Sequence, residues 1–526
     1  MKFVKSFFQI LDDIHTAIFR EGRKAIKGTP AFLLSIVHMI EQLFEYETTK
    51  RILAIVTIIF LCYISFTKSD HYFATTDALP NNISTLNIIF NKKYDITNVA
   101  KSLEKKDLDG IYVTNKDGVI YPKTSVFLGI AGVPAYTFMH HLWGVEKLDN
   151  ESFILSQYSQ YFGKFYASFL SAVSAAFVYL ILRFQKFPHG RSFGLALVYG
   201  LCTNVFNIAA QSNIQHAISL FLVTGATAIF FWKPKNRYTL ITAGIIIGMS
   251  TQIRISNGFY AVFFALITHP SLRKINLAQL KKYLNFVVGF ALGYAALLYY
   301  LKSHNIPNGY QDEIMFSLKI LTPSIFFENA FALLFSYNYG LFFFSPIFLI
   351  LISAVLLRRK IKDSFAPQAF ASFITILIFI SFAASWWMWS GGLSLGARLI
   401  IEAIPLGILL LAYYYDSFLH IQTFKLQMTI LIILSLYFNI LTSFSFDKTW
   451  HDTYTKPGHE SQIRNAWLMK PTLLEYMMQR PMYFDEHLKK NNDTMYVEKK
   501  WYWWDVQELK ILEMKKAKIT ILPIPK

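Results

Sequence analysis

The chain has 526 residues, of which 54% are hydrophobic and only 16% are charged, and its mean hydropathy is +0.35. This composition excludes an ordinary soluble protein of several domains and indicates a membrane protein with many spans. The formal net charge is +18, but the basic residues lie mainly in short loops between apolar runs, a pattern that reflects orientation in a membrane and not nucleic-acid binding.

Residues 1–50 form a charged N-terminal segment. Apolar residues recur at helical spacing over positions 3–19, which predicts an amphipathic helix that lies on the membrane surface or packs against the bundle. The first span follows over residues 51–66, and Lys50 and Arg51 at its beginning predict a cytoplasmic N-terminus.

Ten further apolar runs predict spans, so we expect 11 transmembrane helices in one all-α domain over residues 51–445. Their approximate ranges are 161–182, 192–209, 214–232, 238–253, 255–268, 283–301, 340–357, 367–385, 396–414 and 425–445. The run 124–142 is also apolar, but if it crossed, the basic clusters of the later loops would all move to the outer side, against the usual bias. We therefore predict that this run is a surface helix.

This topology places two long polar segments on the outer side. The first is the loop over residues 68–160, and the second is the C-terminal segment 446–526, which mixes aromatic and β-branched residues and predicts a small α/β cap. The C-terminus is then expected outside.

Several outward ends of the predicted spans carry residues that could bind a ligand. An arginine at the edge of an apolar run is costly unless it meets an anion, a carboxylate or headgroup water, and snorkelling to lipid phosphates is the ordinary alternative. Tryptophans in the same places commonly form an interfacial belt. The candidates in chain order are Asp70, Asp77, Tyr121, Lys123, Gln215, His216, Arg254, Asn257, Trp389 and Arg398.

The order of these segments resembles the GT-C superfamily of integral membrane glycosyltransferases, and is similar to the bacterial protein mannosyltransferases and lipid A aminoarabinose transferases. The resemblance extends over residues 51–415. It lies in an aspartate of the first outer loop, then YPKTSVFLGIAGVPAY, QHA, RISN, YGLFFFSP and WSGGLSLGARLIIEAIP. The chain departs from the family pattern where Lys123 follows Pro122 and where Ala397 precedes Arg398.

The resemblance implies a polyprenyl-phosphate sugar donor and a lipid, glycan or protein acceptor in the bacterial inner membrane, with membrane lipids as further partners and no nucleic acid. Asp77 is expected as the general base, and Asp70 is the alternative. Arg398, Arg254 and Lys123 are expected to contact the donor phosphate. The remaining candidates, which are expected to contact substrate, are Tyr121, Gln215, His216, Asn257 and Trp389.

No cofactor follows from the sequence. A divalent cation held by Asp70 and Asp77 stays open, although two carboxylates seven residues apart are poor evidence for a metal site. Two other functions also stay open. A transporter or flippase of lipid-linked sugars needs many spans too, but acidic residues within the spans are scarce, with Glu402 the main exception. A non-catalytic envelope membrane protein is the third.

Overall fold

The computed structural model describes thirteen stretches of the chain. They are residues 47–68, 78–100, 112–115, 117–122, 126–143, 157–234, 236–268, 277–303, 311–356, 366–391, 396–418, 421–445 and 466–467. The expected N-terminal amphipathic helix lies outside them, as does all of the expected C-terminal cap except Ala466 and Trp467.

The chain is a mostly helical, multi-pass membrane protein, as its composition predicts. Within the described stretches, seven helical segments are long and apolar enough to cross a membrane. They are α3 (Glu47–Thr67), α9 (Gln157–Phe184), α12 (Gln215–Trp232), α15 (Leu277–Ser303), α20 (Ala366–Ala384), η5 (Arg398–Ala403) continued by α21 (Ile404–Phe418), and α22 (Gln422–Ser445).

Two bent pairs raise this number to nine if each pair is one span. One pair joins α10 (His189–Leu201) to α11 (Asn204–Asn207) and η1 (Ala209–Gln211) with a bend of 41°. The other joins α16 (Gln311–Ile320) to α17 (Pro323–Phe335) with a bend of 112°, and its two helices were not among the predicted spans. Eleven spans therefore remain a proposal.

Three of the predicted spans are not among the helices or bent pairs long enough to cross a membrane, because they are interrupted or short. The run 340–357 divides into α18 (Leu341–Phe344), η3 (Pro346–Phe348) and α19 (Leu349–Leu356), because Pro346 has no N–H to continue a helix. The predicted spans 238–253 and 255–268 are both short helical segments, separated at Arg254 by extended backbone (φ −143°, ψ 121°). These are α13 (Arg237–Ile253) and η2 (Ile255–Phe259) with α14 (Tyr260–Thr268).

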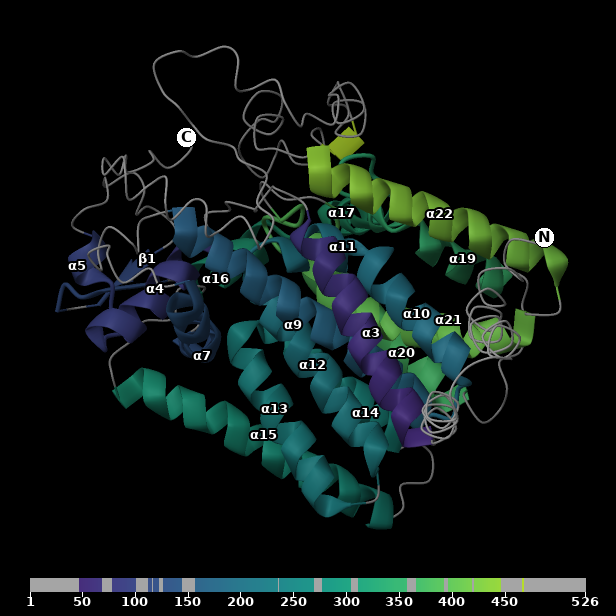
Figure 1. Ribbon diagram of the computed structural model, residues 1–526, viewed down its shortest axis with the longest axis horizontal. Coiled ribbons are helices and arrows are strands. Elements are labelled where there is room, and N and C mark those ends of the chain that lie inside the picture. Colours follow the sequence, from purple (N-terminus) through teal and green to yellow (C-terminus); the bar gives the residue numbers. More distant parts are fainter. Residues whose placement is uncertain are drawn as a thin grey trace, which may run out of the picture.

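A seam of glycines joins α13 to α15, which lies along one edge of the molecule (Figure 1). Gly244 and Gly248 on α13 face Gly289 and Gly293 on α15, and a Cβ atom on any of the four would come within 2.1–2.2 Å of a backbone oxygen of the other helix. Both pairs have the small-xxx-small spacing that lets membrane helices approach backbone to backbone. The two helices are therefore packed as one unit.

The described part of the first outer loop forms a small subdomain at one end of the helices (Figure 1). It contains α4 (Ala78–Asn91), α5 (Thr97–Ala100), and an antiparallel hairpin of β1 (Tyr112–Thr114) and β2 (Ile120–Pro122), with Val113 opposite Tyr121. It also contains α7 (Val126–Trp143), the predicted surface helix, which is not among the seven candidate spans. The hairpin was not predicted.

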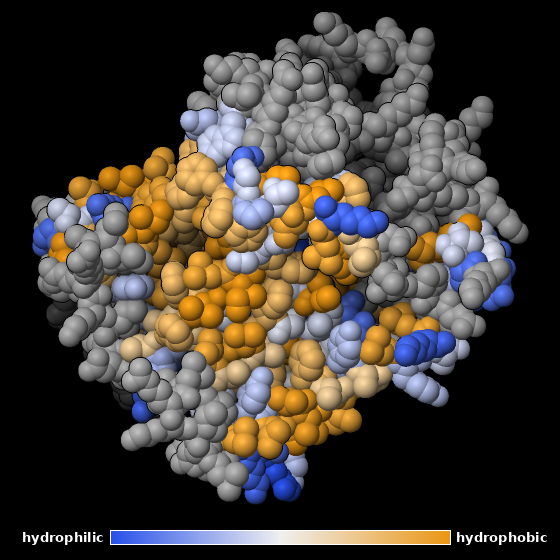
Figure 2. Space-filling view, turned by 180° about the vertical axis from the view of Figure 1, so that it is seen from behind, coloured by the Kyte–Doolittle hydropathy of each residue, from blue (hydrophilic) through white to orange (hydrophobic). Residues whose placement is uncertain are grey.

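The helices expose large apolar side chains where lipid would surround them. Side chains of α15, α20 and α22 such as Leu292 (57% exposed), Phe370 (54%) and Ile433 (54%) point outward. Figure 2 shows a face that is largely apolar, with many of its hydrophilic side chains toward the margins. An exposed apolar surface of this extent is expected for a protein whose solvent is a bilayer.

Candidate functional site

Four ionisable side chains meet where helices begin or break. His216 is the second residue of α12, Arg254 follows the last residue of α13, and Arg398 and Glu402 both belong to η5. We call these four residues the buried charged cluster. The elements are short or end here, so side chains from three parts of the chain that are far apart in sequence reach one place.

Hydrogen bonds fix the state of the histidine. Arg398 Nε lies 3.1 Å from His216 Nε2 and, as an arginine nitrogen, can only donate to it. Nε2 must therefore accept, so the proton of the neutral ring is on Nδ1, which donates to Glu402 Oε1 at 2.8 Å. The imidazole thus connects a guanidinium to a carboxylate.

Glu402 is the anion at the centre of the cluster and is 0% exposed. Arg254 Nε lies 3.2 Å from Glu402 Oε1, an ion pair without the alignment of a hydrogen bond. The Tyr260 hydroxyl donates to the backbone oxygen of Glu402 at 2.8 Å and fixes η5 against α14. A carboxylate buried so completely is tolerated only because it is paired.

The two guanidinium groups converge on the same histidine nitrogen. Arg254 Nη1 lies 3.5 Å from His216 Nε2, on which Arg398 Nε also converges. Arg254 Nη2 donates to Leu399 O at 3.4 Å, and Arg398 Nη1 to Gly391 O at 3.4 Å. Two guanidiniums and one carboxylate give these four side chains one net positive charge, and such a site favours a bound anion, since paired guanidiniums match phosphate oxygens.

The first outer loop is attached beside this cluster. Asn81, in the first turn of α4, donates from Nδ2 to Asn213 O at 2.7 Å, and Asn213 is three residues before His216. Asn213 Nδ2 also faces the Tyr136 hydroxyl (3.0 Å) and Asn82 Oδ1 (3.2 Å). Burial raises the pKa of Tyr136 well above its ordinary value, so its hydroxyl stays protonated and donates to Asn82 Oδ1 at 2.5 Å.

Both predicted aspartates, and Lys123, lie outside the described residues. Asp77 directly precedes Ala78, the first residue of α4, so the chain connects it to the end of α4 that is tied to Asn213. Ala78 itself is fully buried in the same apolar core as Ala397 and Ile401. The link between the start of α4 and the buried charged cluster is the Asn81–Asn213 hydrogen bond, three residues before His216.

The other residues predicted to contact substrate differ in their distance from the cluster and in their structural contacts. Gln215 is buried next to His216. Asn257 donates to Ser219 Oγ (2.5 Å) and Ser250 O (3.0 Å), and Trp389 is 2% exposed and forms a T-shaped ring pair with Tyr339. The last two residues therefore have structural contacts that account for them. Burial also excludes Trp389 from an interfacial belt.

Tyr121 is separate from the cluster in its described contacts. It lies on β2 of the hairpin, and its ring stacks on Tyr94 with centroids 6.3 Å apart. Its half-buried position within the outer subdomain gives it a packing role there.

Glu402 was not among the predicted site residues. Its signal in the sequence was present, because an ionisable residue within a predicted span is a functional candidate by default. It lies four residues after Arg398 inside an apolar run, and its partner His216 is 186 positions away. Nothing in the local pattern identifies that partner.

Within the described stretches, no group of three or more histidine, cysteine, aspartate or glutamate side chains has the arrangement of a metal site. Cys62 and Cys202 are both buried and unbridged. The cluster's own donors, two guanidiniums and a histidine whose Nε2 faces them, are unsuited to a cation.

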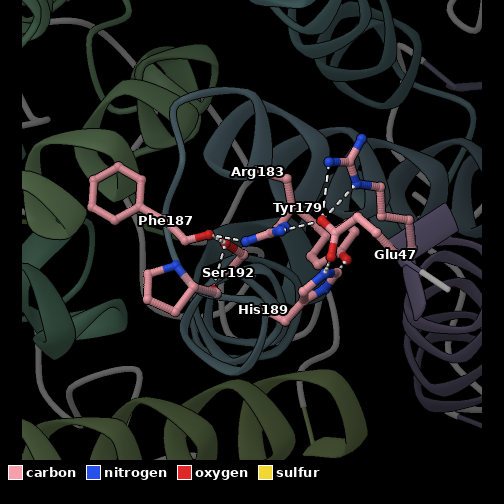
Figure 3. Close-up of polar contacts among 8 residues, drawn as sticks. Glu47, Tyr179, Arg183, Phe187, His189 and Ser192 are labelled. Atoms are coloured by element: carbon pink, nitrogen blue, oxygen red, sulfur yellow. Dashed lines mark hydrogen bonds and ion pairs between the residues drawn. The ribbon is translucent and has the colours of Figure 1, made fainter. Parts of the chain in front are cut away.

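A second cluster of the same residue types lies where α3 begins and α9 ends (Figure 3). Glu47 Oε1 accepts from Arg51 Nη2 at 3.0 Å and also pairs with Arg183, while Glu47 Oε2 lies 2.7 Å from His189 Nε2. His189 Nδ1 in turn lies 2.8 Å from the Tyr179 hydroxyl. We call Glu47, Arg51, Arg183 and His189 the Glu47 cluster; it joins α3, α9 and α10.

The comparisons with known proteins add no family to these observations. The sequence matches no protein-family model, and no curated protein matches it. The function is therefore argued from the site itself.

Proposed function

We propose that the protein is a glycosyltransferase that moves a sugar from a polyprenyl-phosphate donor to a hydroxyl acceptor at the outer face of a bacterial inner membrane. The observation that carries this proposal is the convergence of Arg254 and Arg398 on His216, beside the helix end that follows Asp77. Paired guanidiniums in a site of low dielectric are suited to a phosphate, and the apolar surroundings suit its lipid chain.

In this mechanism Asp77, or Asp70 in its place, takes the proton of the acceptor hydroxyl. The acceptor oxygen forms a bond to C1 of the sugar while the bond between C1 and the phosphate oxygen breaks, and polyprenyl phosphate leaves with the electron pair. Arg398 stabilises the negative charge that develops on the phosphate, and Arg254 and Lys123 are the further phosphate contacts. His216 holds Arg398 in place through its neutral ring.

The proposal includes the predicted topology of 11 spans, with the N-terminus in the cytoplasm and the C-terminus outside. It places α4, the hairpin and α7 on the same outer side as the buried charged cluster. The basic loops between spans, among them the one that contains Lys233 and Arg237, then face the cytoplasm, in accord with the usual bias.

The test is mass spectrometry of lipid-linked sugars and envelope glycans from a deletion strain of the native host. The deletion is expected to abolish one sugar modification and to accumulate its polyprenyl-phosphate donor, and the wild-type chain is expected to restore both. Asp77→Asn should fail to restore the modification. Asp117→Asn, which changes an exposed carboxylate of the hairpin turn in the same loop, should restore it.

Two results would contradict the proposal. If Asp77→Asn and Asp70→Asn, each correctly inserted, both leave the modification at its wild-type level, the protein is not this transferase. If membrane vesicles of the deletion strain transfer the sugar normally but no longer carry the lipid-linked sugar across the membrane, the protein is a flippase.

A further inference from the structure

An apolar groove runs along the outside of the helices, from Phe221, which packs against the core of the outer subdomain, to Trp232 at the other end of α12. It lies between α9 and α12 with α13 at its edge, and its volume is about 330 Å³. Every residue that lines it is apolar. Phe177 and Phe221 lie at one end, where their rings are 5.5 Å apart, and Phe184 and Trp232 lie at the other.

The length of the groove corresponds to one leaflet of a bilayer. Phe221 and Trp232 are 11 residues apart on α12, which at 1.5 Å per residue is about 16.5 Å. The hydrocarbon core of a membrane is about 30 Å thick, so one acyl chain spans about 15 Å. Gly225 lies between the two ends. A Cβ atom there would meet the Phe177 ring at 3.1 Å, so glycine leaves the groove open at this point.

At the Trp232 end the apolar lining of the groove is followed by two basic side chains. Trp232 is 54% exposed, as is typical of an interfacial tryptophan, and Lys233 Nζ lies 4.6 Å from the centre of its ring. Arg237 follows on the first turn of α13 with its guanidinium 4.7 Å from the Tyr238 ring. Lys233 and Arg237 are both exposed, so the apolar groove ends at two cations that face solvent.

The surrounding sequence makes this end strongly positive. No aspartate or glutamate occurs between Glu151 and Asp312, a stretch that contains all three helices of the groove. Among the described residues, Glu47 at the start of α3 is already paired with Arg183 and Arg51. A ligand that fits must therefore join an apolar chain of one leaflet's length to an anionic head.

We propose that this groove binds an anionic phospholipid of the adjacent leaflet, with one acyl chain between α9 and α12 and its phosphate at Lys233 and Arg237. The groove is distinct from the buried charged cluster, since His216 and the Trp232 end lie at opposite ends of α12. The proposal therefore does not depend on the transferase function.

Native mass spectrometry of the detergent-purified full chain, titrated with dioleoylphosphatidylglycerol or dioleoylphosphatidylcholine, tests the proposal. The wild type is expected to bind the anionic lipid more tightly. Each basic residue near a membrane surface contributes about 1 kcal/mol, so the double variant Lys233→Gln/Arg237→Gln should lose roughly 10- to 30-fold of that affinity. The matched control Lys302→Gln, an exposed lysine at the far end of α15, should bind as the wild type does.

A second variant tests the groove itself. Leu222→Trp fills its midplane end and should weaken the binding of both lipids, whereas Leu292→Trp, on the lipid-facing side of α15, should not. Equal wild-type affinity for the two lipids would overturn the proposal. So would unchanged binding of phosphatidylglycerol in both the double variant and Leu222→Trp, or displacement of the lipid by millimolar inorganic phosphate, which would indicate a simple anion site.

Discussion

The buried charged cluster and the Glu47 cluster consist of the same side chains, one glutamate, one histidine and two arginines, and differ in their surroundings. Glu402 is 0% exposed, whereas the side chain of Glu47 is 50% exposed. In the Glu47 cluster both carboxylate oxygens have partners, but the buried Glu402 Oε2 has no hydrogen-bond partner among the described residues. The same side chains therefore form a partly hydrated contact between helices in the Glu47 cluster. In the buried charged cluster they form a desolvated site in which one carboxylate oxygen lacks a hydrogen-bond partner among the described residues.

The free energy of burying charged groups decides how each cluster is interpreted. An exposed ion pair contributes about 0–1 kcal/mol, because water competes for both partners. A buried ion pair is often no better than an apolar replacement of the same volume, so its presence calls for a reason other than stability. The Glu47 cluster needs only its role in joining α3, α9 and α10, whereas the buried charged cluster is the stronger candidate for function.

The largest expected effect comes from removing the buried carboxylate. Glu402→Gln leaves two guanidiniums without their anion, and the free energy of unfolding should fall by about 3–5 kcal/mol. Thermal unfolding of the detergent-purified chain measures this. A loss of less than about 1 kcal/mol would show that Glu402 does not neutralise the arginines.

Arg398→Gln should mainly affect activity. The loss of one donor to a developing anion commonly lowers kcat by about 10²- to 10³-fold, so sugar transfer should fall by that factor while the chain still folds. Arg398→Lys keeps the charge but not the planar fork, and should recover only part of the rate. Arg51→Gln in the Glu47 cluster is the control. Equal transfer by both glutamine variants would remove Arg398 from the mechanism.

Asn213→Ala should have an intermediate effect, because it removes the amide that faces Asn82 and Tyr136 next to the cluster. Leaving buried polar partners unsatisfied costs about 1–3 kcal/mol, and transfer should decline with it if the first outer loop is positioned through this contact. Asn91→Ala, at the exposed end of α4, serves as the comparison for both unfolding and transfer. If Asn213→Ala lowers the stability without any change in transfer, this contact does not position the first outer loop for the reaction.

The smallest effect is expected at the Glu47 cluster. Glu47→Gln should lower the free energy of unfolding by at most about 1 kcal/mol, and high salt should reduce the difference further because exposed pairs are screened. Unfolding measured at low and at high ionic strength tests both statements. A larger, salt-independent loss would mean that this cluster is as tightly coupled to the fold as the buried one.

The membrane class and most of the spans could be predicted from the sequence, because hydrophobic length is a local property. His216, Arg254 and Arg398 were also selected, since each is a polar residue at the end of an apolar run. Their meeting at one nitrogen was beyond prediction, as it depends on the extended backbone at Arg254 and on the angle between distant helices.

Three other features could be predicted from the sequence to different degrees. The break of the 340–357 run follows from Pro346, a residue that interrupts helices wherever it occurs in their interior. The bend of 112° between α16 and α17 depends on packing, and no residue of that segment specifies its angle. The two GxxxG spacings of α13 and α15 were legible in the sequence, but their pairing with each other was not.

The glycine seam between α13 and α15 has a practical consequence for following the site in motion. Because the two backbones touch, α15 cannot shift without α13, and α13 ends at Arg254. Away from this seam, α15 exposes Leu284 and Leu292, each by about half. A spectroscopic label at Leu284 would therefore report movement of the helix that ends at Arg254, without any change to a residue of the buried charged cluster.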